Sequence, residues 1–78
     1  NKFDLEIIFY LNFQEKSIVK LGSICSCLNL IQLNLSRNKL TELKGIELLV
    51  ELKNLDLSFN KIKSIENLSS CKKLKCLY

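Results

Sequence analysis

Residues 52–62 read LKNLDLSFNKI, and this stretch decides the fold because apolar side chains and one asparagine occupy fixed places in it. Leucine or isoleucine stands at the first, fourth, sixth and eleventh places, and Asn60 stands at the ninth. The same template recurs upstream from Leu30 and, more loosely, from Ile8, and a fourth copy begins at Leu74. The four copies are evenly spaced along the chain. A fixed period of this length indicates a solenoid, in which successive coils of chain stack on one another.

The rest of each unit keeps the same register. Small-to-medium apolar residues return every three positions, and they are Leu21, Leu43 and Ile65, then Ile24, Ile46 and Leu68, then Cys27, Leu49 and Cys71. This spacing favours 3₁₀ turns, in which residues i and i+3 eclipse. The alternation around Leu33 and Leu55 favours strands with one buried face. We therefore predict an α/β fold, a right-handed solenoid with a parallel concave β-sheet and 3₁₀ or short helical turns on its convex side.

The repeated pattern resembles the short 22-residue class of leucine-rich repeats. This class is typified by the leucine-rich regulatory subunit of protein phosphatase 1, and the pattern is also similar to the leucine-rich dynein light chain, tubulin-folding factors and a spliceosome subunit. The resemblance implies one leucine-rich-repeat domain over residues 1–78, with an N-terminal cap region at 1–7, rungs at 8–29, 30–51 and 52–73, and a partial rung at 74–78. Because the last rung is partial, we expect the chain to be a fragment of a longer protein.

The concave face is the surface on which we predict a protein partner to bind. Its side chains follow from the strand register, and they are Tyr10, Asn12, Gln14, Gln32, Asn34, Ser36, Arg37, Asn54, Asp56, Ser58, Phe59, Cys76 and Tyr78. Aromatic residues and arginine carry most of the binding energy at protein interfaces, which singles out Arg37, Phe59 and the two tyrosines. The alternative for Phe59 is packing against neighbouring loop residues as a spine of the solenoid, and for Arg37 it is a solvated surface position.

The acidic residues of this face bear on the choice among relatives. The resemblance to the phosphatase regulator implies an acidic and aromatic concave face, whereas Glu15 and Asp56 are the acidic residues at these positions. The choice among phosphatase, dynein, tubulin and spliceosome relatives therefore stays open.

Asn38 and Asn60 occupy equivalent places where each strand ends and the chain turns inward. A tight bend leaves backbone N–H and C=O groups unpaired, and an asparagine amide offers two donors and an acceptor to them. We predict a structural asparagine ladder, in which removal of one member costs about 1–3 kcal/mol. In the first unit Lys16 takes the place of the asparagine.

The sequence contains no pattern typical of an enzyme. It has no histidine and only two glycines, so neither a histidine-based catalytic site nor a glycine-rich phosphate loop is expected. Ser36 and Ser58 hold equivalent places in the repeat, which explains them better than nucleophilic chemistry does. We predict a non-enzymatic interaction scaffold or adaptor without a cofactor or metal.

The four cysteines are expected to be reduced. Cys27 and Cys71 hold the same inward place two rungs apart, and with about 4.8 Å per rung their Cα atoms lie beyond disulfide reach. Cys25 and Cys27 supply two thiolates, fewer than the four ligands of a structural zinc site. We predict a cytoplasmic protein, with a nuclear or ciliary location as further options, and the alternative is a disulfide-linked extracellular repeat.

The net charge of +4 comes mainly from the C-terminal end, where Lys61, Lys63, Lys72, Lys73 and Lys75 stand against Glu66. Such runs are usually solvated, so we do not expect a nucleic-acid partner. An RNA-associated or anion-binding adaptor is the alternative that uses these lysines. The longest uncharged run, residues 21–36, is too short and too polar to span a bilayer, so membrane insertion is not expected.

The last rung suggests a third alternative, a structural cap within a larger multidomain protein. Its apolar residues Leu68, Cys71, Leu74 and Leu77 lack a following rung in this sequence. An uncovered apolar surface favours association. We therefore expect self-association through this uncapped C-terminal rung, or burial of the rung against a partner chain.

Overall fold

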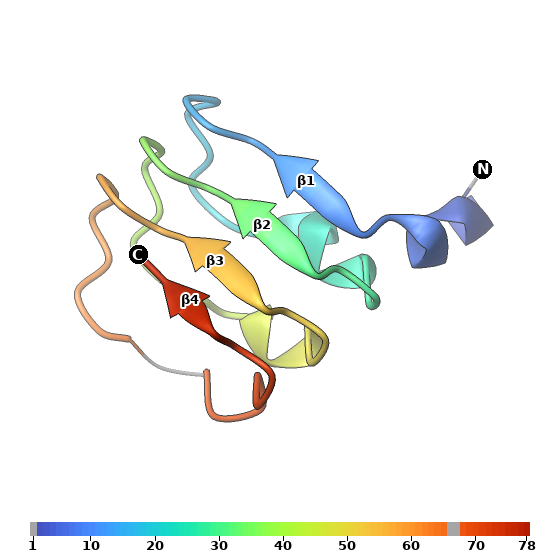
Figure 1. Cartoon of the computed structure of the whole chain (residues 1–78). Coiled ribbons are helices and arrows are strands. Elements are labelled where there is room, and N and C mark those ends of the chain that lie inside the picture. The colour runs from blue at the N-terminus through green and yellow to red at the C-terminus, as the bar shows by residue number, and fades with distance from the viewer. Residues whose placement is uncertain (1, 66–67) are drawn as a thin grey trace.

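Four short parallel strands form one sheet in chain order, as Figure 1 shows. The computed structural model describes residues 2–65 and 68–78, so Asn1 of the predicted cap and residues 66–67 of the third rung lie outside the described residues. The strands are β1 (Tyr10–Asn12), β2 (Gln32–Asn34), β3 (Asn54–Asp56) and β4 (Cys76–Leu77). Leu11, Leu33, Leu55 and Leu77 are paired across the sheet, each with its equivalent in the next repeat. The predicted solenoid with a parallel sheet is confirmed.

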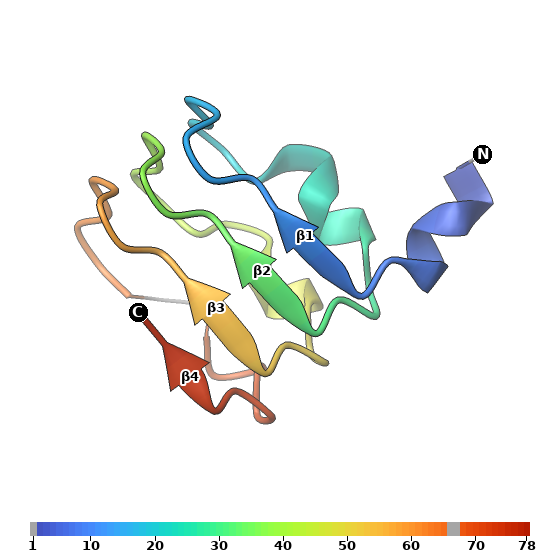
Figure 2. The same ribbon diagram turned by 45° about the horizontal axis from the view of Figure 1, so that its top comes forward.

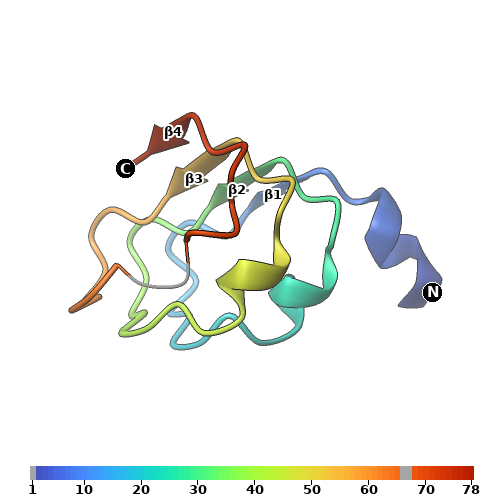
Figure 3. The ribbon, with the colours of Figure 1, turned by 90° about the horizontal axis from the view of Figure 1, so that it is seen from below.

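The opposite side of the solenoid carries short 3₁₀ turns, as predicted. These are η2 (Gly22–Ser26) in the first rung and η3 (Ile46–Leu48) in the second, and Figure 3 shows both on the far side of each coil from the sheet. A further 3₁₀ helix, η1 (Lys2–Ile7), precedes β1 at the N-terminal end of the solenoid. The first two coils therefore have a strand on one side and a 3₁₀ turn on the other.

The core lies between these two sides and consists mainly of the periodic leucines. Its fully buried members are Leu30, Leu33, Leu35, Leu40, Ile46, Leu49, Leu52 and Leu55. All of them belong to the second and third rungs, which have a neighbouring rung on both sides. Burying one such side chain contributes about 1.5–3 kcal/mol, so these two rungs hold most of the hydrophobic stabilisation.

The terminal rungs are less well covered. In the first rung Ile8, Leu11, Phe13 and Ile18 are only partly buried against the core. In the last described rung Leu77 is 45% exposed, although it is in register with the fully buried Leu55. Burial thus decreases from the central rungs toward both ends, as expected for a solenoid whose terminal repeats lack one neighbour.

Candidate protein-binding face

The floor of the concave face is formed by two columns of side chains on the four strands. One column contains Tyr10, Gln32, Asn54 and Cys76, and the other contains Asn12, Asn34, Asp56 and Tyr78. We call these eight residues the concave floor. Tyr10 and Tyr78 are 66% and 70% exposed, and they lie at the first and last strands. The floor therefore has an exposed aromatic ring at each end and amides and a carboxylate between them.

The residue that ends each strand also caps the turn that follows. Asn34 Oδ1 accepts hydrogen bonds from the backbone N–H of Ser36 at 2.9 Å and from the Ser36 hydroxyl at 2.8 Å. Asp56 Oδ1 accepts the equivalent bonds from Ser58, at 3.0 and 2.6 Å. These are Asx turns, in which the side chain bonds the backbone two residues on. In the first rung Asn12 Oδ1 accepts only the backbone N–H of Gln14, at 3.0 Å.

This capping changes the interpretation of two predicted contact residues. Ser36 is buried and its hydroxyl turns back to Asn34, so its side chain supports the turn and does not present itself to a partner. Ser58 is half-buried and is held in the same way by Asp56. Gln14 is exposed. The Asn-x-Ser and Asp-x-Ser spacing in the sequence is the signal by which these turns could have been recognised.

The centre of the floor retains unused hydrogen-bonding groups. Among the described residues, nothing bonds the side-chain amides of Gln32 and Asn54, the Nδ2 of Asn34 or the Oδ2 of Asp56. These four side chains, with Tyr78, line a hollow of about 150 Å³. The hollow can therefore bind a group that both donates and accepts hydrogen bonds.

Glu15, Arg37 and Phe59 form a third column just beyond the ends of the strands. All three have a left-handed backbone, with φ of 56°, 59° and 58°, which is uncommon for residues other than glycine. Arg37 Nε lies 3.9 Å from Glu15 Oε1, and its guanidinium carbon lies 4.5 Å from the centre of the Phe59 ring. Phe59 is 69% exposed. The column thus combines an ion pair with a cation–π contact and leaves the aromatic ring accessible.

Asn38 and Asn60 directly follow two residues of this column in the sequence. They make matching hydrogen bonds one rung apart. Asn38 Oδ1 accepts the backbone N–H groups of Lys16 and Ile18, at 2.9 and 3.0 Å. Its Nδ2 donates to the carbonyls of Phe13, Leu35 and Ser36, at 2.8, 2.9 and 3.2 Å.

Asn60 repeats this geometry. Its Nδ2 donates to the carbonyls of Leu35 and Leu57, both at 2.9 Å, and its Oδ1 accepts the N–H of Leu40 at 3.0 Å. Both amides bridge their own turn to the preceding rung. They therefore fix the shape of the loops that hold the third column.

The C-terminal lysines do not form one cluster. Lys61 and Lys63 follow β3, whereas Lys72, Lys73 and Lys75 precede β4. Because the strands are parallel, strand ends and strand starts lie on opposite edges of the sheet, which Figure 2 shows. The five lysines that the anion-binding alternative uses are therefore divided between these two edges.

The edge of the sheet at which the strands begin, which we call the strand-start edge, contains an ion pair. Lys73 Nζ lies 2.8 Å from Glu51 Oε1. The Lys75 backbone N–H donates to the carbonyl of Lys53 at 2.8 Å, which places these two lysines one rung apart.

The cysteines are free thiols packed into the solenoid. Cys25, Cys27 and Cys71 are buried, and Cys76 is half-buried on the concave floor. Burial raises the pKa of the Cys25, Cys27 and Cys71 thiols, and Glu47 adds to the shift at Cys25 and Cys71. The Cys71 thiol donates to the carbonyl of Leu49 at 3.4 Å. These three thiols are neutral core groups, which is the opposite of a reactive, low-pKa cysteine.

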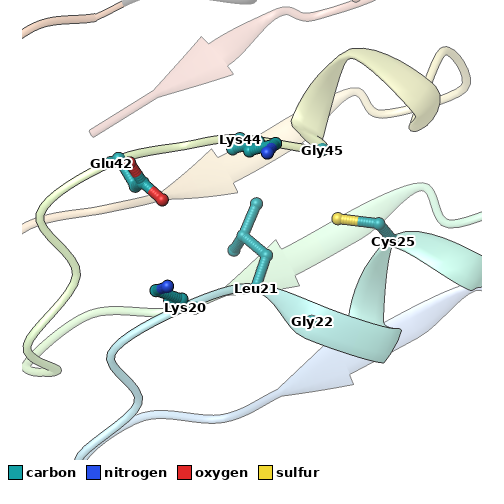
Figure 4. A pocket seen from close by; sticks show the side chains of 7 residues that line it. All are labelled: Lys20, Leu21, Gly22, Cys25, Glu42, Lys44 and Gly45. Carbon is teal, nitrogen blue, oxygen red and sulfur yellow. The ribbon is translucent and has the colours of Figure 1, made fainter.

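The convex side carries a hollow of about 380 Å³ between the first and second rungs, shown in Figure 4. It is lined by Lys20, Leu21, Gly22, Cys25, Glu42, Lys44 and Gly45. A side chain at Gly45 would place its Cβ 2.5 Å from Cys25 Sγ, and Gly45 has a φ of 101°. Packing against the thiol and the backbone conformation both require glycine at this position.

Neither a metal-binding cluster nor a membrane-spanning helix is found in the described part of the chain. No group of three or more His, Cys, Asp or Glu side chains within residues 2–65 and 68–78 could hold a metal ion. In that same part of the chain, no helix has the length and apolar character needed to cross a membrane.

The coil arrangement is shared with a solved protein structure. Internalin C2 from Listeria monocytogenes superimposes with a TM-score of 0.65 over 100% of this chain, at 24% sequence identity. This chain spans 44% of the length of the internalin chain. At this identity the likeness establishes the fold alone.

Residues 50–78 match a family model described as "Leucine Rich repeats (2 copies)". The matched residues are leucine-rich repeats, and the whole chain has the fold of a repeat solenoid. No curated protein sequence matches it. The matched repeats include β3, β4 and the loop that carries Phe59 and Asn60. The identification of the repeat therefore covers part of the candidate binding face.

Proposed function

We propose that this leucine-rich-repeat solenoid is a non-enzymatic scaffold that binds a protein partner on its concave floor. Leucine-rich-repeat domains generally mediate protein–protein interactions. The observation that supports the floor most strongly is its combination of unused amide and carboxylate groups with exposed tyrosines at both ends. Aromatic anchors around a hydrogen-bonding centre are typical of protein interfaces.

The unused groups favour a polar partner segment over a purely apolar one. Gln32 and Asn54 each offer donors and an acceptor, while Asp56 Oδ2 offers an acceptor and Asn34 Nδ2 offers donors. A partner that fills the hollow without pairing these groups would incur their desolvation cost, about 1–3 kcal/mol for each group. The floor therefore selects for a partner whose backbone or side chains match this donor and acceptor pattern.

A triple substitution of the floor tests the proposal. Tyr10→Ala, Gln32→Ala and Asn54→Ala remove side chains that bond nothing among the described residues, so the fold should be unchanged. The wild-type chain and the triple variant are immobilised and exposed to lysate, and captured proteins are compared by quantitative mass spectrometry. We expect a partner that is retained by the wild type and lost by the triple variant.

A convex variant is the matched control. Thr41→Ala and Glu42→Ala change exposed residues on the opposite side of the second rung. The partner should remain bound to this variant. Equal capture by the floor variant and the wild type would show that the concave floor is not the binding surface.

The cellular location and the last rung belong to the same proposal. We place the scaffold in a reducing compartment, with the cytoplasm first and the nucleus or cilium as further options, because its four thiols are unpaired. Self-association through the last rung stays a prediction, supported by the exposure of Ile65 and Leu77. Sedimentation velocity over a range of concentrations tests it, and an unchanged monomer at high concentration would contradict it.

A further inference from the structure

A row of exposed residues follows the ends of the strands on three successive rungs. It consists of Lys16, Arg37, Lys39, Phe59 and Lys61, which we call the strand-end ridge. The backbone hydrogen bonds place these residues on neighbouring coils. The Lys39 N–H donates to the carbonyl of Ile18 at 2.8 Å, and the Lys61 N–H donates to the carbonyl of Leu40 at 2.9 Å. The ridge is therefore continuous across the solenoid.

The ridge carries an excess of positive charge that the chain itself does not neutralise. Glu15 is its acidic neighbour, and it pairs with Arg37 at 3.9 Å. Among the described residues, no acidic side chain pairs with Lys16, Lys39 or Lys61. Lys39 and Lys61 hold equivalent places one rung apart, and strands are spaced by about 4.8 Å. Like charges on adjacent rungs repel each other, so the arrangement favours an anionic partner.

Phe59 adds an apolar contact to the same ridge. It has a left-handed backbone, and its side chain is 69% exposed. The Arg37 guanidinium carbon lies 4.5 Å from the ring centre. An exposed aromatic ring on the same ridge as three unpaired lysines suits a ligand that combines negative charge with an apolar side chain.

We propose that the strand-end ridge binds an acidic protein segment that carries an apolar side chain. Its carboxylates would pair with Lys39 and Lys61, and its apolar side chain would pack on the exposed part of Phe59. The ridge spans about 10 Å from the first rung to the third. This length suits a short peptide better than a single nucleic acid strand, which covers roughly 4–16 nucleotides on an OB-fold domain.

The positions of the other lysines also favour a short peptide over a nucleic acid strand. The lysines of the strand-start edge lie across the sheet and do not extend the ridge into a longer basic track. Lys16, Lys39 and Lys61 lie outside the concave floor, and the proposal uses none of the floor residues. The two proposals can therefore be tested with separate substitutions.

Two double charge reversals test the ridge. Lys39→Glu with Lys61→Glu reverses two ridge lysines, and Lys53→Glu with Lys75→Glu makes the same change in net charge at the strand-start edge, also on adjacent rungs. The probe is a fluorescein-labelled peptide of glutamates with one central phenylalanine, and its binding is measured by fluorescence anisotropy at low and at physiological salt. Circular dichroism verifies that each variant is folded.

The expected result is a loss of at least about tenfold in affinity for the ridge variant and a change within about threefold for the strand-start variant. Higher salt should weaken binding of the wild type, because exposed charges are screened. Equal losses in both variants would overturn the proposal, since net charge alone would then explain binding. Absence of wild-type binding at low salt would overturn it as well. Tighter binding of a labelled oligouridine that also depends on Lys39 and Lys61 would overturn it too, because the ridge would then be assigned to nucleic acid.

Removal of an acidic charge gives a second test, in which peptide binding should become stronger. Glu15→Gln removes the negative charge beside Arg37 and should strengthen peptide binding about two- to threefold. Glu51→Gln makes the same change in charge at the strand-start edge and should leave binding unchanged. An equal gain from both substitutions would show that the ridge is not the site.

Discussion

Removal of the Asn38 side chain is expected to destabilise the fold more than any other asparagine substitution in the described part of the chain. Asn38 is 7% exposed, and its amide bridges the first and second rungs. In Asn38→Ala the N–H groups of Lys16 and Ile18 and the carbonyl of Phe13 lose their partner. The Leu35 carbonyl retains the hydrogen bond from Asn60.

The expected cost follows from these three groups. A net loss of about 1 kcal/mol for each gives about 3 kcal/mol, and partial access of water at the first rung sets a lower limit of about 2 kcal/mol. A chain of 78 residues has a total stability of about 4–12 kcal/mol, at roughly 0.05–0.15 kcal/mol per residue. The single substitution therefore removes between a sixth and most of the free energy of unfolding.

Urea unfolding followed by far-UV circular dichroism measures this cost, with two matched variants. Asn60→Ala should cost less, because Asn60 is only half-buried. Asn54→Ala should stay within about 0.5 kcal/mol of the wild type, since its side chain bonds nothing among the described residues. A cost below about 1 kcal/mol for Asn38→Ala, or one equal to that of Asn54→Ala, would refute the reasoning.

Three further predictions concern the backbone and the thiols. Ser17 has a φ of 57°, so Ser17→Gly should raise the free energy of unfolding by about 0.5–1 kcal/mol in urea titrations, and a decrease would contradict this. Gly45→Ala should lower it by roughly 1–3 kcal/mol through overlap with Cys25, and Cys25→Ala should restore part of the loss in the double variant if the overlap is the cause. Burial raises the pKa of Cys25, Cys27 and Cys71, so above the ordinary thiol pKa of about 8.5 the unfolded chain releases protons that the folded chain retains. The contribution of these thiols to stability should therefore be constant up to that value and fall as the pH rises further, and a variant with alanine at all three positions should lose this contribution when urea midpoints are compared at neutral and at alkaline pH.

The periodicity alone predicted the residues that share a column and most of those that face the core, although Ile65, one of the periodic apolar residues, is 59% exposed. Leu33 and Leu55 are almost fully buried and in register because the sequence returns the same apolar side chain once in every repeat. The 3₁₀ turns followed from the three-residue spacing on the other side of the coil. These features depend on repeated local patterns, which a sequence displays directly.

The side-chain caps of the turns after the strands were not predicted. Strand alternation, extended past Asn34, placed Ser36 on the binding face, whereas the strand ends at Asn34 and the serine hydroxyl turns back to it. The left-handed backbone of Arg37 and Phe59 also gave no local signal, because neither residue favours that conformation. This left-handed backbone recurs at the same place in successive rungs, and it is seen only in the three-dimensional structure.

The C-terminal lysines, which the anion-binding alternative grouped together, are separated for a topological reason. Lys61 and Lys75 are close in the sequence, but one follows a strand and the other precedes the next parallel strand, which puts them on opposite edges of the sheet. Residues at equivalent places in successive repeats, such as Lys39 and Lys61, are the true neighbours. In a solenoid, surface patches must be assembled by column and not by distance along the chain.

The stacking register is the claim on which both proposed surfaces depend, and backbone NMR of the full chain tests it directly. The fold requires nuclear Overhauser effects between neighbouring strands in the register Leu11–Leu33–Leu55, together with slow exchange of the Leu35 amide proton, which donates to the carbonyl of Asp56 at 2.9 Å. A register shifted by a single position would turn the floor side chains into the core. Such a shift, or helical contacts in place of these cross-strand effects, would contradict the account.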